Sequence, residues 1–437
     1  MEGMSGVWRK KVCRVAVFLY LCIGIEHPMN LRRALILTAL LLAAAGVRGQ
    51  QWRLCGDAQR GTLYLDLDRL WNYNLYERSR WGAGLLYVHD GQGSRRFSAA
   101  GYYGYGVKDR KSKWGVSFDL MRKGARERHL RLTAAYDLTA AGSRRMEEVH
   151  LTDFSRNAAF MSLRMSHTER VSVGWSEQVS DILQLNAEGT YSAEQRLYDG
   201  DGLLYPDSYY RQGQKTLYSY RELTVGAGWR WGLQAKLLVG STEESGSCMP
   251  MRYLRMLTQY SRTFTLSPVE LRLFGQAGWS DGLGHEVPYS RMYDLGGTWG
   301  SPLHFEHSLL TARPNEFTAN VFTLVSLRLG AARPLWQWWS AFAQVGSYPK
   351  PFAGVNAAWG HLWGEDAAGQ RLWQGLALQS PRMGIVEPVV GIDGLMRWGL
   401  VDWGVAMTWR LVPAGAAYRR SGWRENTTLL VTASLAL

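Results

Sequence analysis

The chain has no long apolar segment after its first 49 residues, which excludes membrane-spanning helices from the rest of the sequence. A spanning helix needs roughly 20 consecutive apolar residues, and no such run occurs there. Cysteine is also scarce, since only Cys55 and Cys248 follow this first segment. Two distant cysteines do not form a disulfide framework, and none stands where lipid attachment would require it. The sequence assigns no role to either cysteine.

Other patterns are absent as well. Apolar residues rarely recur at helical spacing, and no repeat of about 40–50 residues marks a β-propeller. The formal net charge is +13, but the 50 lysines and arginines are scattered and do not interleave with aromatic residues in a patch. A nucleic-acid partner is therefore not expected.

The first 49 residues have the composition of an export leader. Two arginines precede an apolar run, Ala34–Ala45, interrupted only by Thr38, and small or apolar residues follow at Val47 and Gly49. These are the regions of a secretory signal peptide, so we expect cleavage after Gly49. The alternative is a membrane anchor, but about a dozen apolar residues are too few to span. Residues 1–28 either lengthen the leader or precede a true start at Met29, which we favour because Met29 already begins a complete signal.

Alternation of apolar and polar residues predicts β-strands along the remaining chain. In VDWGVAMTWRLV, residues 401–412, every second side chain is apolar and the others are mostly small or polar. Successive side chains of a strand point to opposite faces, so such a segment has one apolar face. The segment 224–239 alternates throughout and forms either one long tilted strand or a tight hairpin. The same alternation recurs in segments 113–120, 129–138, 171–175, 182–191 and 269–273.

The connections between these segments predict a structure with two unlike ends. Outer-membrane barrels have short periplasmic turns and long outer loops. Tryptophan and tyrosine number 20 and 22 against 12 phenylalanines, which is the balance expected of aromatic girdles at the membrane surfaces. Short connections are predicted near 177–181, 330–334 and 393–394, and long ones through 194–215, 280–316 and 412–425.

We therefore expect an all-β fold, a transmembrane antiparallel β-barrel in the bacterial outer membrane, rather than a secreted β-sandwich. Residues 1–49 form the leader and signal peptide, and residues 50–79 an N-terminal periplasmic or lumen-lining segment with one weak strand, TLYLDLD. Residues 80–437 form the barrel, closed within one monomer. At roughly 10 residues per strand and about as many per connection, this length supplies about 16–18 strands.

Strand alternation also assigns side chains to the two faces of the barrel wall. We expect four residues to face lipid: Trp403, Val405, Met407 and Trp409. An arginine at Val405 should then be costly, whereas one at Thr408 would meet water. Mixed charge inside a barrel fits either a selectivity zone or a salt-bridged plug. Seven charged residues are predicted to line the lumen: Arg131, Asp137, Glu188, Glu270, Arg272, Asp402 and Arg410.

Two clusters in the long segment 280–316 suggest a metal site. Imidazole and carboxylate suit zinc or iron, so capture of a metal or haem by this loop is one interpretation. The other is a set of solvated loop residues, because the spacing fits no established ligand pattern. The candidate ligands are His285, Glu286, His304, Glu306 and His307.

Two further motifs have simpler explanations. GWSDG, residues 278–282, matches the nucleophile elbow, but Ser280 runs into a loop where the elbow needs a helix. YDGDGLLYPDSYY, residues 198–210, resembles the start of a calcium loop but lacks the later glutamate. Both are expected to be turns, so we predict neither enzymatic activity nor a cofactor.

The C-terminal TTLLVTASLAL resembles the last strand by which barrels are recognised for insertion, although it ends in Leu437 rather than an aromatic residue. With the early WNYNLYERSRWG and the following YYGYGVKDRKSKWGVSFD, the plan resembles a family of outer-membrane β-barrels from anaerobic Gram-negative bacteria. The resemblance is one of pattern over the whole mature chain. It implies a fold and a location, and no functional residue.

These features predict a porin-like channel, or the barrel subunit of an uptake complex, for a small polar solute. The alternative is a non-conducting surface barrel whose outer loops bind a partner or ligand. A barrel enzyme is less favoured, because no Ser–His–Asp set or carboxylate pair converges on one rim. The expected partners are outer-membrane lipid, the barrel-insertion machinery and a co-encoded outer-membrane uptake partner.

Overall fold

The computed structural model describes most of the chain from residue 51 onward. No helix in this part is long and apolar enough to cross a membrane. The signal peptide predicted within 1–49 lies outside the described residues, as does Cys248, whereas Cys55 is an exposed free thiol. The described ranges are 51–57, 61–66, 69–74, 77–91, 95–122, 124, 126–140, 142, 146, 165–196, 217–244, 250–284, 287–296, 309–312, 316–332, 349–362, 380–398, 401–419 and 422–435.

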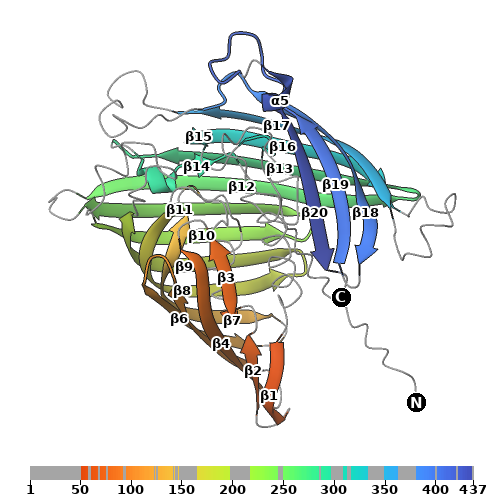
Figure 1. Cartoon of the computed structure of the whole chain (residues 1–437). Helices are drawn as coiled ribbons and strands as arrows, with labels where there is room; N and C mark the ends of the chain where they lie inside the picture. Colours follow the sequence, from red (N-terminus) through yellow and green to blue (C-terminus); the bar gives the residue numbers. More distant parts are fainter. Residues whose placement is uncertain are drawn as a thin grey trace.

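An 18-stranded antiparallel sheet dominates the described structure and curves around a central space (Figure 1). This count agrees with the 16–18 strands predicted, although the first three of the 18 strands lie in the segment 50–79, which the prediction left outside the barrel. The strands are β1 (Gln51–Asp57), β2 (Gly61–Asp66), β3 (Trp71–Asn74), β4 (Arg78–Asp90), β5 (Arg95–Gly106), β6 (Ser112–Arg122), β7 (Arg128–Ala140), β8 (Met165–Ser180), β9 (Leu183–Arg196), β10 (Leu217–Trp229), β11 (Leu233–Glu244), β12 (Met251–Leu266), β13 (Val269–Asp281), β16 (Val321–Ala331), β17 (Lys350–His361), β18 (Ile385–Trp398), β19 (Val401–Trp409) and β20 (Thr427–Leu435).

From β4 onward, each strand pairs with the next strand of this sheet along the chain. β2 and β3 both pair with one edge of β4, and β1 pairs with β2. The described part of the segment 50–79, predicted to be periplasmic or to line the lumen, contributes β1, β2 and β3 to this sheet. β1 and β20 end the series, and no strand pairing joins them within the described ranges. Closure within one monomer stays a prediction.

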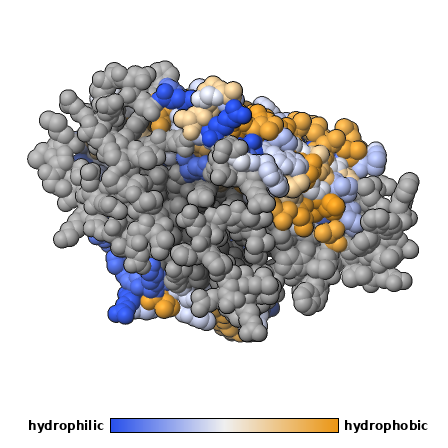
Figure 2. Space-filling view, turned by 45° about the horizontal axis from the view of Figure 1, so that its top comes forward, coloured by the Kyte–Doolittle hydropathy of each residue, from blue (hydrophilic) through white to orange (hydrophobic). Residues whose placement is uncertain are grey.

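The outer face of the sheet is apolar and the inner face is not. In β16, the outward Val325, Leu327 and Leu329 are 41–52% exposed, whereas the inward Ser326 and Arg328 are buried. Apolar side chains also gather on the surface in Figure 2. A soluble protein would bury the apolar face and expose the polar one. The exposed apolar face of this sheet therefore contacts lipid. This is the architecture of a transmembrane β-barrel.

Most connections differ in length between the two ends of the barrel, as the sequence predicts, although the long connection 332–349 lies at the same end as the short turns. Residues 181–182, 230–232 and 267–268 are short turns at one end, called here the turn end. The segments 141–164 and 282–320 are long connections at the other end, called here the loop end. Short turns face the periplasm and long loops face outward in barrels of this kind.

The structure resolves the ambiguity in 224–239, which forms a tight hairpin. β10 ends at Trp229 and β11 begins at Leu233, and Gly232 has φ +100° in the turn between them. Glycine adopts this left-handed conformation without steric cost, so the turn can be short.

Two predicted short turns are wrong. Residues 393–394 lie inside β18, where the register with β19 is irregular between Ile392 and Met396 and Gly394 has φ +63°. The Asp-Gly pair that suggests a turn here forms a bulge instead. The connection beginning near 330–334 is long, because β16 ends at Ala331 and β17 begins at Lys350.

Candidate functional site

The long connection between β13 and β16 folds back onto the inner face of the barrel. We call its described part, residues 287–296, 309–312 and 316–320, the plug. It contains a 3-10 turn, η2 (Tyr289–Arg291), and a two-stranded ladder of β14 (Tyr293–Asp294) and β15 (Thr318–Ala319). Inward-facing side chains of the wall pack against it and form the main apolar core: Leu257, Phe274, Phe322, Leu324, Ala358 and Ile385.

The plug is attached to β9 and β10 mainly through Arg291, beside a hydrogen bond of 3.0 Å between the hydroxyls of Ser290 and Tyr220. Arg291 donates to Glu222 over 2.7 and 3.1 Å and to Glu194 over 2.7 Å. Its guanidinium carbon lies 3.9 Å from the centre of the Tyr220 ring. Burial alone would lower the pKa of Arg291, but the two carboxylates raise it well above its ordinary value. Arg291 is therefore a charged and fully engaged side chain.

A second fastening holds the plug to β18 and to the residue that follows β19. Glu387 is fully buried and accepts hydrogen bonds from the backbone N–H groups of Leu310 over 2.7 Å and Thr311 over 2.9 Å. Arg410 donates to the carbonyl oxygen of Thr311 over 2.7 Å and pairs with Glu316 over 2.8 Å. Because the two fastenings attach to distant strands, the plug bridges the inner face of the wall at the loop end.

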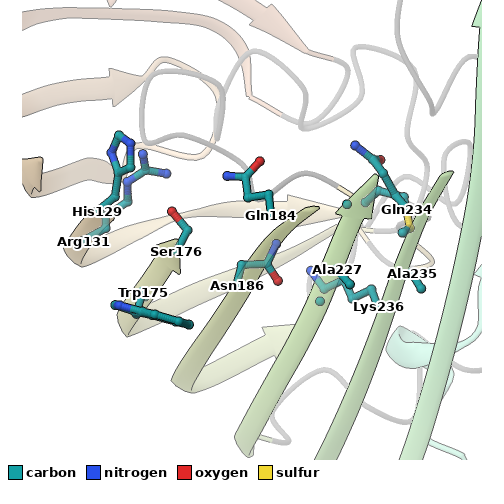
Figure 3. A pocket seen from close by; sticks show the side chains of 14 residues that line it. His129, Arg131, Trp175, Ser176, Gln184, Asn186, Ala227, Gln234, Ala235 and Lys236 are labelled. Carbon is teal, nitrogen blue, oxygen red and sulfur yellow. The ribbon is translucent and has the colours of Figure 1, made fainter. Parts of the chain in front are cut away.

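A polar cavity of about 330 Å³ lies at the turn end of β7–β11 (Figure 3). Met146 both packs against the apolar core of the plug and lines the cavity, so the two are adjacent. Gly226 leaves room beside Asn186, since a Cβ there would come within 2.2 Å of the carboxamide oxygen. The polar residues lining the cavity are His129, Arg131, Ser176, Gln184, Asn186, Gln234 and Lys236.

Most of the charged residues predicted to line the lumen lie within ion pairs, four of them inside the wall and one between Arg410 and the plug. The pairs are Arg131–Asp119, Asp137–Arg80, Glu188–Arg170, Glu270–Arg272 and Arg410–Glu316. The side chain of Asp402 is outside the described residues. Of this set, Arg131 lines the cavity and Arg410 holds the plug. The interior therefore carries paired charge rather than a ring of one sign.

β19 places Val405, Met407 and Trp409 on a partly exposed face, and the side chain of Trp403 is not described. Thr408, between them, is 0% exposed. On the same inner face, Ala406 packs against Leu310 of the plug. The expectation that an arginine at Thr408 meets water is therefore wrong, because the plug and wall fill this part of the lumen.

Replacement of Val405 by arginine is expected to destabilise the barrel by about 2–4 kcal/mol if the site lies near the bilayer midplane. The control is Gln184→Arg, because Gln184 is exposed and lines the polar cavity. The folded fraction in vesicles, read from heat-modifiable gel migration, compares the variants. Equal losses would contradict the assignment of the two faces.

The remaining predicted motifs add no site to the described structure. The five candidate metal ligands, His285, Glu286, His304, Glu306 and His307, lie outside the described residues, as does the loop 198–210. Within the described ranges no group of three or more His, Cys, Asp or Glu could hold a metal ion. Ser280 is buried near the end of β13 and donates to the carbonyl oxygen of Asn320, so it is not an exposed nucleophile.

Sequence reasoning missed the residues that hold the plug. Glu222 and Glu387 carried a usable signal, since each is a carboxylate at an inward position of an alternating strand. Arg291 carried none, because it lies in an irregular segment with no periodicity.

Comparison with known proteins supports the fold and nothing finer. No protein-family model matches the sequence, and no curated protein matches it. BamA from Haemophilus ducreyi lacking POTRA domains 1–3 aligns with a TM-score of 0.50 and 11% identity, over 92% of this chain and 78% of that one. At this identity the likeness concerns the fold alone.

Two other solved structures align less closely. CdiB from Acinetobacter baumannii aligns with a TM-score of 0.42 and 8% identity over 82% of this chain, which spans only 57% of CdiB. The outer membrane protein OprD from Pseudomonas aeruginosa aligns with a TM-score of 0.34 and 10% identity, over 85% of this chain and 90% of OprD. With its apolar outer face and polar, plugged lumen, the chain is a bacterial outer-membrane β-barrel protein.

Proposed function

We propose that the barrel conducts a small polar solute across the outer membrane, as a porin-like channel or as the barrel subunit of an uptake complex. The observation that supports this proposal is the polar cavity next to a plug fastened on two sides. The plug is held by side chains and by isolated backbone hydrogen bonds, such as that from the N–H of Asn320 to the carbonyl oxygen of His361, rather than by a continuous strand ladder with the wall. We expect that such a plug can move without unfolding the wall.

The lining of the cavity favours a polar solute of modest size. Its volume of about 330 Å³ lies at the small end of typical ligand cavities. The carboxamides of Gln184, Asn186 and Gln234 can each donate and accept hydrogen bonds. Arg131 is already paired with Asp119, so it does not add an uncompensated positive charge to the lining.

Planar-bilayer recording tests the proposal on the purified, folded barrel. We expect discrete ion currents that decrease when a permeating solute occupies the cavity. Gln234→Leu, which removes a carboxamide from the lining, should weaken that block. Its matched control is Gln259→Leu on β12, because Gln259 does not line the cavity and bonds to Gln276 instead. Silence from protein with heat-modifiable migration would instead favour a non-conducting barrel that binds a partner through its outer loops.

A further inference from the structure

Three arginines stand side by side on neighbouring strands at the turn end of the barrel. Arg95 of β5 is the register partner of Arg122 of β6, and Arg122 is the partner of Arg128 of β7. All three are exposed. Like charges directly opposite each other on a sheet are destabilising, so this row needs a source of negative charge.

Within the described residues, little negative charge lies beside this row. The next residue along it is Glu177 of β8, which accepts from Arg128 over 3.0 Å and lies 3.8 Å from Arg126. One carboxylate thus serves two guanidinium groups. Glu127 in the adjoining turn bonds to His129, whose side chain lines the lumen.

The row lies on the lipid-facing side of the wall. Two residues further into the membrane, the next outward row is Phe97, Leu120, Leu130 and Trp175, which are also register partners. Leu120, Leu130 and Trp175 are 40–50% exposed. The arginine row therefore borders the apolar belt at the level where headgroups lie, and tryptophan is typical of that boundary.

We infer that Arg95, Arg122 and Arg128 bind the headgroup phosphate of an anionic phospholipid, whose acyl chains lie along the apolar row. Guanidinium groups match phosphate oxygens in bidentate geometry and are weakly hydrated, which suits them to this surface. The long arginine side chains reach the headgroup level while their stems stay against apolar surface. The proposal stands whether or not the barrel conducts.

The test is the triple variant Arg95→Gln, Arg122→Gln, Arg128→Gln, refolded into phosphatidylcholine vesicles with and without phosphatidylglycerol. The urea midpoint of wild type should rise with phosphatidylglycerol, and that of the triple variant should not. In phosphatidylcholine alone the variant should be at least as stable as wild type, because three mutually repelling charges have been removed. Lipid retention in native mass spectrometry should fall on the order of 100-fold, at roughly fivefold per arginine.

Arg262→Gln is the matched control, since Arg262 lies near the turn end of β12 with Leu273 as its register partner. It should keep the full response to phosphatidylglycerol. An equal loss in this control, or an unchanged response in the triple variant, would overturn the proposal. Equally tight binding of soluble glycerol phosphate would show a free-phosphate site and overturn the assignment to lipid.

Discussion

Replacing Glu387 with alanine should loosen the plug from β18 and lower the stability of the barrel. The change leaves the buried N–H groups of Leu310 and Thr311 without their acceptor. Each buried donor left unpaired costs about 1–3 kcal/mol, so the expected loss is roughly 2–6 kcal/mol. Urea unfolding in vesicles measures the loss, and faster hydrogen–deuterium exchange in the plug locates it.

Glu270→Ala is the matched control for this experiment. Glu270 pairs with Arg272 on the wall, is partly exposed, and does not contact the plug in the described structure. Partly exposed ion pairs contribute about 0–1 kcal/mol, so the control should unfold nearly as wild type does. Unchanged exchange at Leu310 and Thr311 in Glu387→Ala would contradict the fastening.

Replacing Arg291 with glutamine should open the other side of the plug. The change leaves the largely buried carboxylates of Glu194 and Glu222 without a cation. Breaking a buried ion pair by removing one partner costs about 3–5 kcal/mol of stability. If about 3 kcal/mol of this loss destabilises the closed state relative to the open state, the ratio of open to closed barrels rises on the order of 100-fold. Single-channel recording should then show larger or more frequent openings than wild type.

Two variants separate this effect from general damage to the wall. Arg170→Gln removes a wall ion pair with Glu188 that does not involve the plug, so its openings should match wild type. The triple variant Arg291→Gln, Glu194→Gln, Glu222→Gln also removes the two carboxylates that Arg291→Gln leaves without a cation, and it should recover part of the lost stability. Larger openings in Arg170→Gln but not in Arg291→Gln would exclude the plug as the gate.

The wall of the barrel was predictable because its signal is local. Alternation along 113–120 or 182–191 identifies a strand without knowledge of any other part of the chain. Where two outcomes share the same local chemistry, the prediction failed. An Asp-Gly pair suits a hairpin turn and a bulge equally, and only the pairing of β18 with β19 decides between them at 393–394.

The plug was not predictable, because its partners are distant in sequence and its own segment is irregular. Arg291 lies 97 residues from Glu194, and Arg410 lies 99 residues from Thr311. No periodic pattern links such residues. The alternation of side chains also led to the wrong prediction at Thr408. It marks one face of a strand as polar but does not show whether water or protein fills the space beside that face.

The position of the plug in the chain has a consequence for the order of assembly. The partners of Arg291 on β9 and β10 are synthesised before the plug, whereas Glu387 on β18 and Arg410 just after β19 are synthesised after it. The first fastening can therefore form within a chain that still lacks its last strands, and the second cannot. Contacts this far apart in sequence form slowly. A barrel that assembled in chain order would pass through a stage in which its interior segment is tethered on one side and free on the other.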